Sequence, residues 1–424
     1  MLAFLPWLRL RTPVVEGPFQ LFPQGVGDVL PAGVASTVAP ETMAKVLGQY
    51  RDSANVPLRV VPVLQYDGRP LGADFDETDR DAIFRFGQHL AVSGMSDRRF
   101  IGGFPDDYTA SGHYQVIIQA FPDPYTGSIN TTHRRKGGHA NVFMGQGDVH
   151  FVRPAHLVSQ GEPTLNLRLL TALQAFQSLP KGVHEHVEAS VTQFLLANSD
   201  SPDVSLEAES IATYAALERV SDSSQKLVDI QAKLPAILAL ADGSPWTARL
   251  RDELELPAGT ERSVLHAWLQ QIYALRGNVA HGKPAHWAPQ QWSQQEHLIA
   301  GAFVYPLVLK CRLAQHGLYS LNEEDVARTL GLEKLLGDRP FFEVPPKTAE
   351  PSEPGGPTAE PTDELALGVL AMRDEAWLRM TRWQRQFDVI NDALLGLALS
   401  GTIRGVIEQY ESRPAGDVAA PDAN

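Results

Sequence analysis

Cysteine is almost absent from this chain, which has only Cys311 among its 424 residues. A single thiol cannot form a disulfide framework within the chain, and it cannot supply the several cysteine ligands of a structural zinc site. Chains without disulfides are typical of reducing compartments, so we expect a cytoplasmic protein.

Long apolar runs are also missing. The most apolar stretch, residues 298–309, is shorter than the roughly 20 residues that cross a bilayer, and it contains Tyr305 and Pro306. Residues 1–8 are apolar but lack a basic lead and a small-residue cleavage site. We therefore expect neither a membrane-spanning segment nor a signal peptide.

Positive charge is in short supply, with 36 Lys and Arg against 50 Asp and Glu and a net charge of −14. Such a surface repels nucleic acid as a whole, so RNA binding requires a local basic patch. Part of the acidity is local, because residues 343–364 hold six acidic residues and one lysine.

The distribution of apolar residues predicts an α+β protein of several domains. Residues 1–160 contain short β-type runs, such as 58–66 and 114–121, separated by turn residues, and they predict a β-rich or mixed domain. Asp67-Gly68 predicts a hairpin turn, and residues 79–92 predict a helix. From residue 161 to 344, apolar residues recur every three or four positions, which predicts a bundle of helices.

The C-terminal part has a different composition. Residues 345–363 are rich in Pro and Glu and predict a flexible linker. Residues 364–411 predict one more helix, which can dock on the bundle, bind a partner or pair with a second copy. Residues 412–424 predict a disordered tail.

Polar residues gather at the end of one amphipathic helix in the bundle. The apolar stripe from Val264 to Val279 predicts this helix, and Gly282 and Pro284 end it. Arg276, Asn278 and His281 therefore lie in its last turns. On an ideal helix, Arg276 and His281 face apart, so they can reach one phosphate only if the last turn distorts or two copies pair in a homodimer.

The segment YALRGNVAHG, residues 273–282, resembles the signature helix of the HEPN superfamily and is most similar to its ApeA-like branch. The resemblance covers about residues 165–317. Members are small helical bundles that commonly dimerise; many are metal-independent endoribonucleases of toxin–antitoxin or phage-defence systems. Others are non-catalytic scaffolds or nucleotide binders. The family often has a polar residue directly after the arginine, whereas this chain has Gly277 there and Asn278 next.

The resemblance implies that Arg276 binds the scissile phosphate and that His281 is the general acid or base. These residue types suit RNA cleavage by the 2′-hydroxyl, which requires no metal or cofactor. Asn278 can orient His281 or the ribose, and Lys283 adds a positive charge for RNA. Glu218 can approach Arg276 from a neighbouring helix. The alternative is a helix end with a cation favoured by the helix dipole, in a regulator that binds nucleotide or protein. The implied partners are RNA, a second copy and an antitoxin or regulatory protein.

Three further groups of polar residues have a candidate role. His133, Arg134, Arg135 and Lys136 precede two glycines; they can bind RNA phosphates or form an exposed charged loop. This segment also contains Arg and His five positions apart, but chance alone gives about one such match in a chain of this composition. The acidic residues 74–81 favour a solvated helix start over a calcium loop. His184 and His186 diverge on a helix, which disfavours a shared metal ion.

Overall fold

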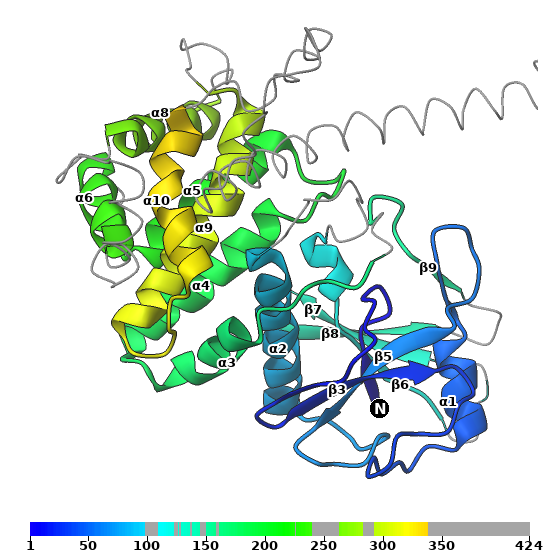
Figure 1. The fold of residues 1–424 in the computed structure, drawn as a ribbon. Helices are drawn as coiled ribbons and strands as arrows, with labels where there is room; N and C mark the ends of the chain where they lie inside the picture. Colours follow the sequence, from blue (N-terminus) through cyan, green and yellow to red (C-terminus); the bar gives the residue numbers. More distant parts are fainter. Residues whose placement is uncertain are drawn as a thin grey trace, which may run out of the picture. The chain divides into compact units, whose positions relative to one another are not determined.

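The computed structural model describes residues 1–97, 109–122, 126, 129–135, 138–144, 150–157, 161–224, 226–239, 263–282 and 292–337. The chain divides into two compact units, Met1–Ala376 and Trp377–Asn424, and every described residue belongs to the first. The predicted linker, C-terminal helix and tail lie outside the described residues, as do Lys136 and Lys283. The fold is α+β, as predicted, with strands first and helices after them (Figure 1).

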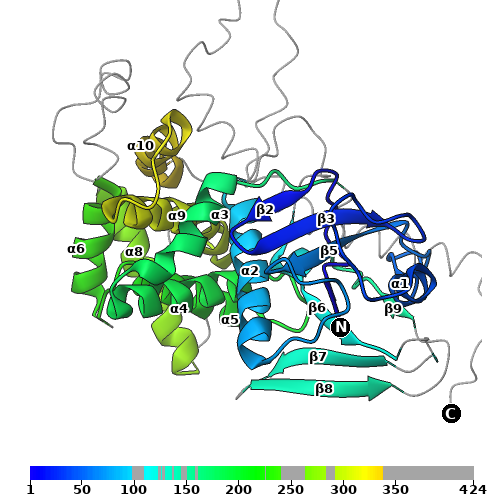
Figure 2. The same cartoon turned by 90° about the horizontal axis from the view of Figure 1, so that it is seen from below.

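A seven-stranded antiparallel sheet forms the N-terminal part, in the order β2-β3-β5-β1-β6-β7-β8 (Figure 2). Its strands are β1 (Leu2–Phe4), β2 (Val14–Glu16), β3 (Phe19–Gly25), β5 (Val60–Tyr66), β6 (Ile117–Ala120), β7 (Ile129–Arg135) and β8 (Gly138–Met144). The apolar N-terminal residues form β1 in the middle of the sheet, where all three are buried. A separate parallel pair joins β4 (Tyr50–Arg51) to β9 (Phe151–Val152).

The two strands expected around residues 58–66 and 114–121 are present as β5 and β6. The turn at Asp67-Gly68 is also present, with φ of +53° and +64° and with the Arg69 amide donating to the Tyr66 carbonyl at 3.0 Å. It does not close a hairpin, because the next paired residue, Leu71, forms a parallel bridge with Ser36. The turn residues determined the local backbone but not the partner of the following segment.

The acidic residues near 76 begin a helix, α2 (Glu77–Ser96), as expected. Asp76 caps it, and Asp79 completes a capping box. Asp79 is not solvated, however, since it is buried and accepts a 2.6 Å hydrogen bond from the Arg69 guanidinium. A short helix, α1 (Pro40–Leu47), precedes α2 in the chain. The Phe86 ring of α2 stacks on Phe19 of β3 at 4.4 Å, so α2 covers the sheet.

The bundle follows as α3 (Leu167–Ala175), α4 (Lys181–Ala197), α5 (Leu206–Val220), α6 (Leu227–Leu238), α8 (Ser263–Ala280), α9 (Gln294–Gln315) and α10 (Glu323–Gly337). Two 3-10 turns, η2 (Ser111–Tyr114) and η3 (Phe176–Ser178), complete the described helical elements. Helix α5 packs against α4, α8 and α9. The predicted capping box between Ser293 and Glu296 starts α9, and Gly317 follows its end with φ of +71°.

Helix α2 lies between the sheet and the bundle (Figures 1 and 2) and contacts α3, α4 and α9. A buried polar network joins the elements at its C-terminal end. The ammonium of Lys310 on α9 pairs with Asp97, which caps α2, and with Asp325 on α10. Asn166, the cap of α3, donates to Asp97 at 2.5 Å. The sheet and the bundle thus share a buried junction within one compact unit.

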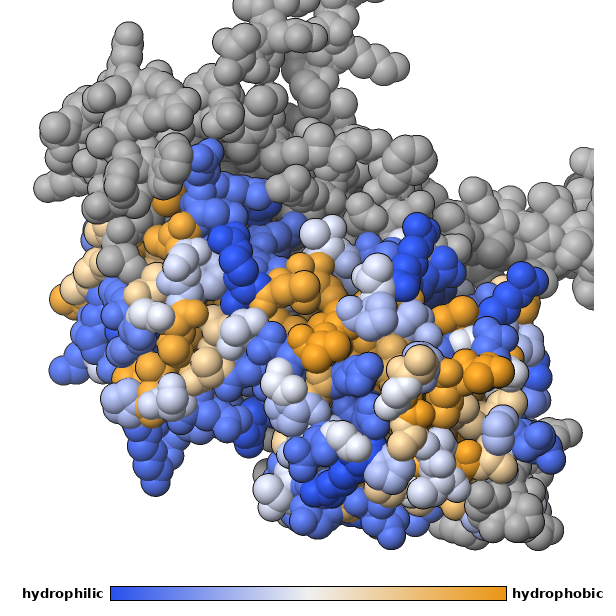
Figure 3. All heavy atoms as spheres, turned by 60° about the horizontal axis from the view of Figure 1, so that its bottom comes forward, coloured by the Kyte–Doolittle hydropathy of each residue, from blue (hydrophilic) through white to orange (hydrophobic). Residues whose placement is uncertain are grey.

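Among the described residues, one helix, α9, is long and apolar enough to cross a bilayer by length and composition. Helix α9 begins before the apolar run at residues 298–309 and ends after it, so the helix is longer than the run considered from the sequence. However, 83% of its most apolar window is buried inside the protein, as expected of a helix in the core of the bundle. On the face shown in Figure 3, apolar residues form separate patches among hydrophilic ones.

Candidate functional site

Helix α8 carries the HEPN-like residues and has one fully buried face. Its apolar stripe points into the bundle, and these side chains have no exposed surface: Leu265, Trp268, Leu269, Ile272 and Leu275. The stripe confirms the helix predicted from periodicity, and it packs α8 against α5, α6 and α10. Outside the stripe, Arg276 and Asn278 are half-buried and His281 is exposed. The three predicted site residues are therefore not part of the core.

The last turn of α8 is regular. The His281 amide donates to the carbonyls of Gly277 at 3.1 Å and Asn278 at 3.2 Å, so helical bonding continues to His281. Gly282 follows with φ of +68°, as predicted for the residue just past a helix end. Five helical positions separate Arg276 and His281 by about 140° around the axis. One chain therefore brings Asn278 and His281 to a common face and leaves Arg276 on another.

Arg276 instead lies against helix α5. Its guanidinium carbon is 5.2 Å from the ring centroid of Tyr214, and the Tyr214 ring is 5.7 Å from that of Tyr273. Glu218 is one helical turn after Tyr214 on α5, and it interacts electrostatically with Arg276. The sequence had suggested this approach of Glu218 to Arg276. Two residues of α5 and two of α8 thus form one polar cluster.

The α5 side of this cluster is deeply buried. Tyr214 has no exposed surface and Glu218 is 8% exposed. The Tyr214 hydroxyl and the Glu218 Oε1 are also buried without a hydrogen-bond partner among the described residues. Burial raises the pKa of Glu218, and the positive charges of Arg276 and Arg219 partly oppose that rise. Burial, with a smaller effect of Glu218, raises the pKa of Tyr214.

The basic segment at residues 133–139 is a β-hairpin rather than the exposed loop considered from the sequence. His133, Arg134 and Arg135 end β7, and β8 begins at Gly138, which pairs with Arg135. Only residues 136 and 137 lie between the paired strands. The two glycines suggested a loop, but the second of them, Gly138, already pairs with Arg135 as part of β8. Connections of two residues are common between antiparallel strands. The sheet therefore extends through most of this segment.

His184 and His186 on α4 have different neighbours. The His184 Nε2 is 3.6 Å from a carboxylate oxygen of Glu188, and the His186 Nδ1 is 2.7 Å from one of Asp222. In the part of the chain that the structure describes, no three His, Cys, Asp or Glu side chains gather as metal ligands.

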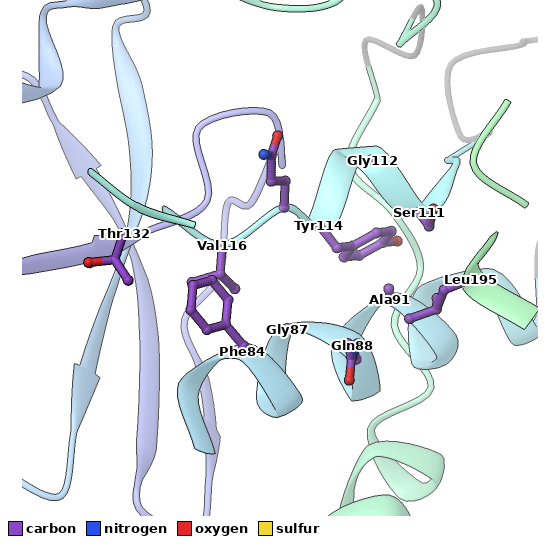
Figure 4. A pocket seen from close by; sticks show the side chains of 11 residues that line it. Phe84, Gly87, Gln88, Ala91, Ser111, Gly112, Tyr114, Val116, Thr132 and Leu195 are labelled. Carbon is purple, nitrogen blue, oxygen red and sulfur yellow. The ribbon is translucent and has the colours of Figure 1, made fainter. Parts of the chain in front are cut away.

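A cavity of about 360 Å³ lies between α2, η2, the segment entering β6, β7 and α4 (Figure 4). All of its lining residues are uncharged, and they are Phe84, Gly87, Gln88, Ala91, Ser111, Gly112, Tyr114, Gln115, Val116, Thr132 and Leu195. Sequence reasoning missed this cavity because its walls come from segments far apart in the chain. No local motif in those segments marks it.

Comparison of the chain with protein-family models, curated proteins and solved structures gives no match. The resemblance to the HEPN superfamily therefore rests on residues 273–282 and on their position at the end of a bundle helix.

Proposed function

We propose that this protein is a metal-independent endoribonuclease of the HEPN type that acts as a toxin or phage-defence effector in the cytoplasm. The observation that carries the proposal is the placement of Arg276 and His281 outside the core, at the end of a helix whose opposite face is fully buried. Arg276 binds the scissile phosphate and His281 is the general acid or base. His281 is exposed and Arg276 is half-buried, so each side chain retains surface that RNA can contact.

The proposed site forms between two copies of the chain. Because the last turn of α8 is regular, Arg276 and His281 of one chain face about 140° apart. A two-fold axis near the ends of two α8 helices brings Arg276 of one copy toward His281 of the other. Asn278 lies on the same face as His281 and orients the imidazole or the ribose.

The proposed reaction needs only proton transfer and charge stabilisation. The 2′-hydroxyl loses its proton and attacks the adjacent phosphorus, the bond to the 5′-oxygen breaks, and that oxygen gains a proton. The products are a 2′,3′-cyclic phosphate and a 5′-hydroxyl. Imidazole can accept and return these protons near neutral pH, while a guanidinium binds two phosphate oxygens.

RNA outside the scissile bond requires basic residues, because the net charge of the chain is −14. We assign this role to Lys283 and to His133, Arg134, Arg135 and Lys136. An antitoxin or other regulatory protein is proposed as the partner that restrains cleavage.

Cleavage in the presence of EDTA tests the proposal. Purified protein is incubated with total RNA and with tRNA, beside the variants His281→Ala and Arg276→Ala and the exposed control His150→Ala. We expect cleavage by the wild type and the control, and none by the two site variants. Folded, dimeric wild-type protein that leaves all of these RNAs intact would rule out the nuclease.

One observation favours a second function, that of a non-catalytic regulator that binds nucleotide or protein. Arg276 already contacts Tyr214 and interacts with Glu218 inside its own chain, as an arginine with a structural role would. In that case Arg276→Ala lowers the stability of the fold, and the wild type cleaves no RNA. The same set of variants therefore distinguishes the two functions.

A further inference from the structure

The cluster around Arg276 contains a carboxylate that the HEPN-like segment does not include. We infer that Glu218, together with the Tyr214 ring, is the positioning residue that holds the Arg276 guanidinium for phosphate binding. The inference rests on the proposed role of Arg276 and adds a residue from another helix, α5, to that site. Glu218 acts through Arg276 and does not touch the substrate.

Helix α5 is a rigid support for this arrangement. It is packed by α4, α8 and α9, and Tyr214 and Glu218 lie four positions apart on its buried side. The guanidinium carbon of Arg276 lies over the face of the Tyr214 ring, 5.2 Å from the ring centroid. A cation over an aromatic face leaves its N–H groups available for other acceptors. The ring therefore fixes Arg276 without using the donors that bind phosphate.

The carboxylate of Glu218 attracts the Arg276 guanidinium in addition to this ring contact. Glu218 interacts electrostatically with Arg276, and among the described residues the Glu218 Oε1 is buried without a hydrogen-bond partner. Glu218 thus attracts the guanidinium within surroundings that screen charge less than water does. Tyr214, Tyr273, Arg219 and Arg276 are the titratable side chains that interact around it. Its attraction restrains Arg276 and leaves the guanidinium donors free.

Chemical modification of Arg276 tests this inference in the full-length protein. Phenylglyoxal attacks a guanidine that has lost its proton, so a nearby carboxylate slows the reaction. Glu218→Gln keeps the shape and removes the charge, and Tyr214→Leu removes the ring. We expect each to raise the modification rate of Arg276 about threefold or more. Tyr214→Phe retains the ring and should leave the rate unchanged.

Mass spectrometry gives the rate at Arg276 relative to the exposed Arg59 in the same sample. Glu207→Gln, at the other end of α5, is the matched control for loss of one negative charge. Equal Arg276 rates in the wild type, Glu218→Gln and Tyr214→Leu would overturn the inference. If Glu218→Gln does not fold, as judged by circular dichroism, the Tyr214→Leu and Tyr214→Phe pair decides the outcome.

RNA cleavage separates this inference from the proposed function. If Glu218 positions Arg276 in a nuclease, Glu218→Gln lowers kcat and the loss follows the rise in modification, while Glu207→Gln is unaffected. If modification rises in Glu218→Gln but the wild type cleaves no RNA, the positioning role stands and the nuclease is rejected. If the wild type cleaves and Glu218→Gln cleaves equally with unchanged modification, the nuclease stands and the positioning role is rejected.

Discussion

Lys310 on α9 and Asp325 on α10 form a buried ion pair, with the Lys310 Nζ 2.7 Å from the Asp325 Oδ1. Lys310 is 1% exposed, and its ammonium also pairs with Asp97 at the end of α2. The Tyr319 hydroxyl donates to the other carboxylate oxygen of Asp325 at 2.9 Å. A buried lysine is tolerated here because two carboxylates compensate its charge. Burial opposes ionisation of Asp97, but Lys310, Arg328 and Asn166 together hold the pKa of Asp97 below its usual value.

Loss of the Lys310 charge should destabilise the whole described unit. Lys310→Met keeps most of the volume but leaves two carboxylates without their cation, and we expect the free energy of unfolding to fall by about 3–5 kcal/mol. Urea unfolding followed by circular dichroism measures the loss. Lys181→Met is the control, because Lys181 pairs with Glu185 at 3.7 Å on the surface and such pairs contribute less than about 1 kcal/mol. Similar losses in both variants would contradict a structural role for the buried pair.

The buried His89 should make the protein less stable in acid. Burial lowers the pKa of His89 from 6.5 to about 3, with Arg85 and His184 adding to the effect. Between these two values the unfolded chain binds a proton that the folded chain excludes. The free energy of unfolding therefore falls as pH falls through this window, by up to about 1.4 kcal/mol per pH unit.

His89→Gln should remove that dependence. Glutamine is neutral and can still bond to Gln174, whose amide lies 2.9 Å from the His89 Nδ1. Urea unfolding between pH 6.5 and pH 4 should give a flatter profile for His89→Gln than for the wild type. The exposed control His150→Gln should keep the wild-type slope. An unchanged slope in His89→Gln would assign the acid sensitivity to other groups.

Two glycines inside bundle helices should respond to alanine in opposite directions. A Cβ at Gly301 on α9 would lie 2.1 Å from the Thr213 Cγ2 on α5, whereas one at Gly277 on α8 meets nothing within 4 Å. Gly301→Ala should therefore destabilise by about 1–3 kcal/mol. Gly277→Ala should stabilise by up to about 1 kcal/mol, because alanine favours helix more than glycine does. Thermal unfolding of the two variants tests the pair, and a loss of stability in Gly277→Ala would show that α8 is packed there.

Local patterns were sufficient to predict the elements that carry the proposed site. The apolar spacing along α8 matches its buried face, and Gly282 has the left-handed backbone expected past the helix end. The capping box of Ser293 and Glu296 likewise marks the start of α9. Each of these features depends on residues within a few positions of one another, which is the range over which helical period and capping act.

Contacts between distant segments were not predictable in the same way. Strand β1 pairs with β5 and β6, so Ala3 lies opposite Leu64 and Ile118. No local pattern around Lys310 indicates its partner Asp97, which lies 213 positions earlier. The hairpin at residues 133–139 was misread for a related reason, since its strands are defined by their pairing and not by composition.

Mixing two inactive variants tests whether the proposed site forms between copies. In a dimer of Arg276→Ala with His281→Ala, one of the two composite sites has both wild-type residues and the other has neither. With random mixing, half of the dimers are of this kind, so activity should return to about a quarter of the wild-type value. RNA cleavage after co-refolding measures the recovery, and native mass spectrometry counts the mixed dimers. A matched mixture of Arg276→Ala with the double variant supplies no intact arginine and should stay inactive. If mixed dimers form but cleave no RNA, Arg276 of one copy and His281 of the other do not act in a shared site.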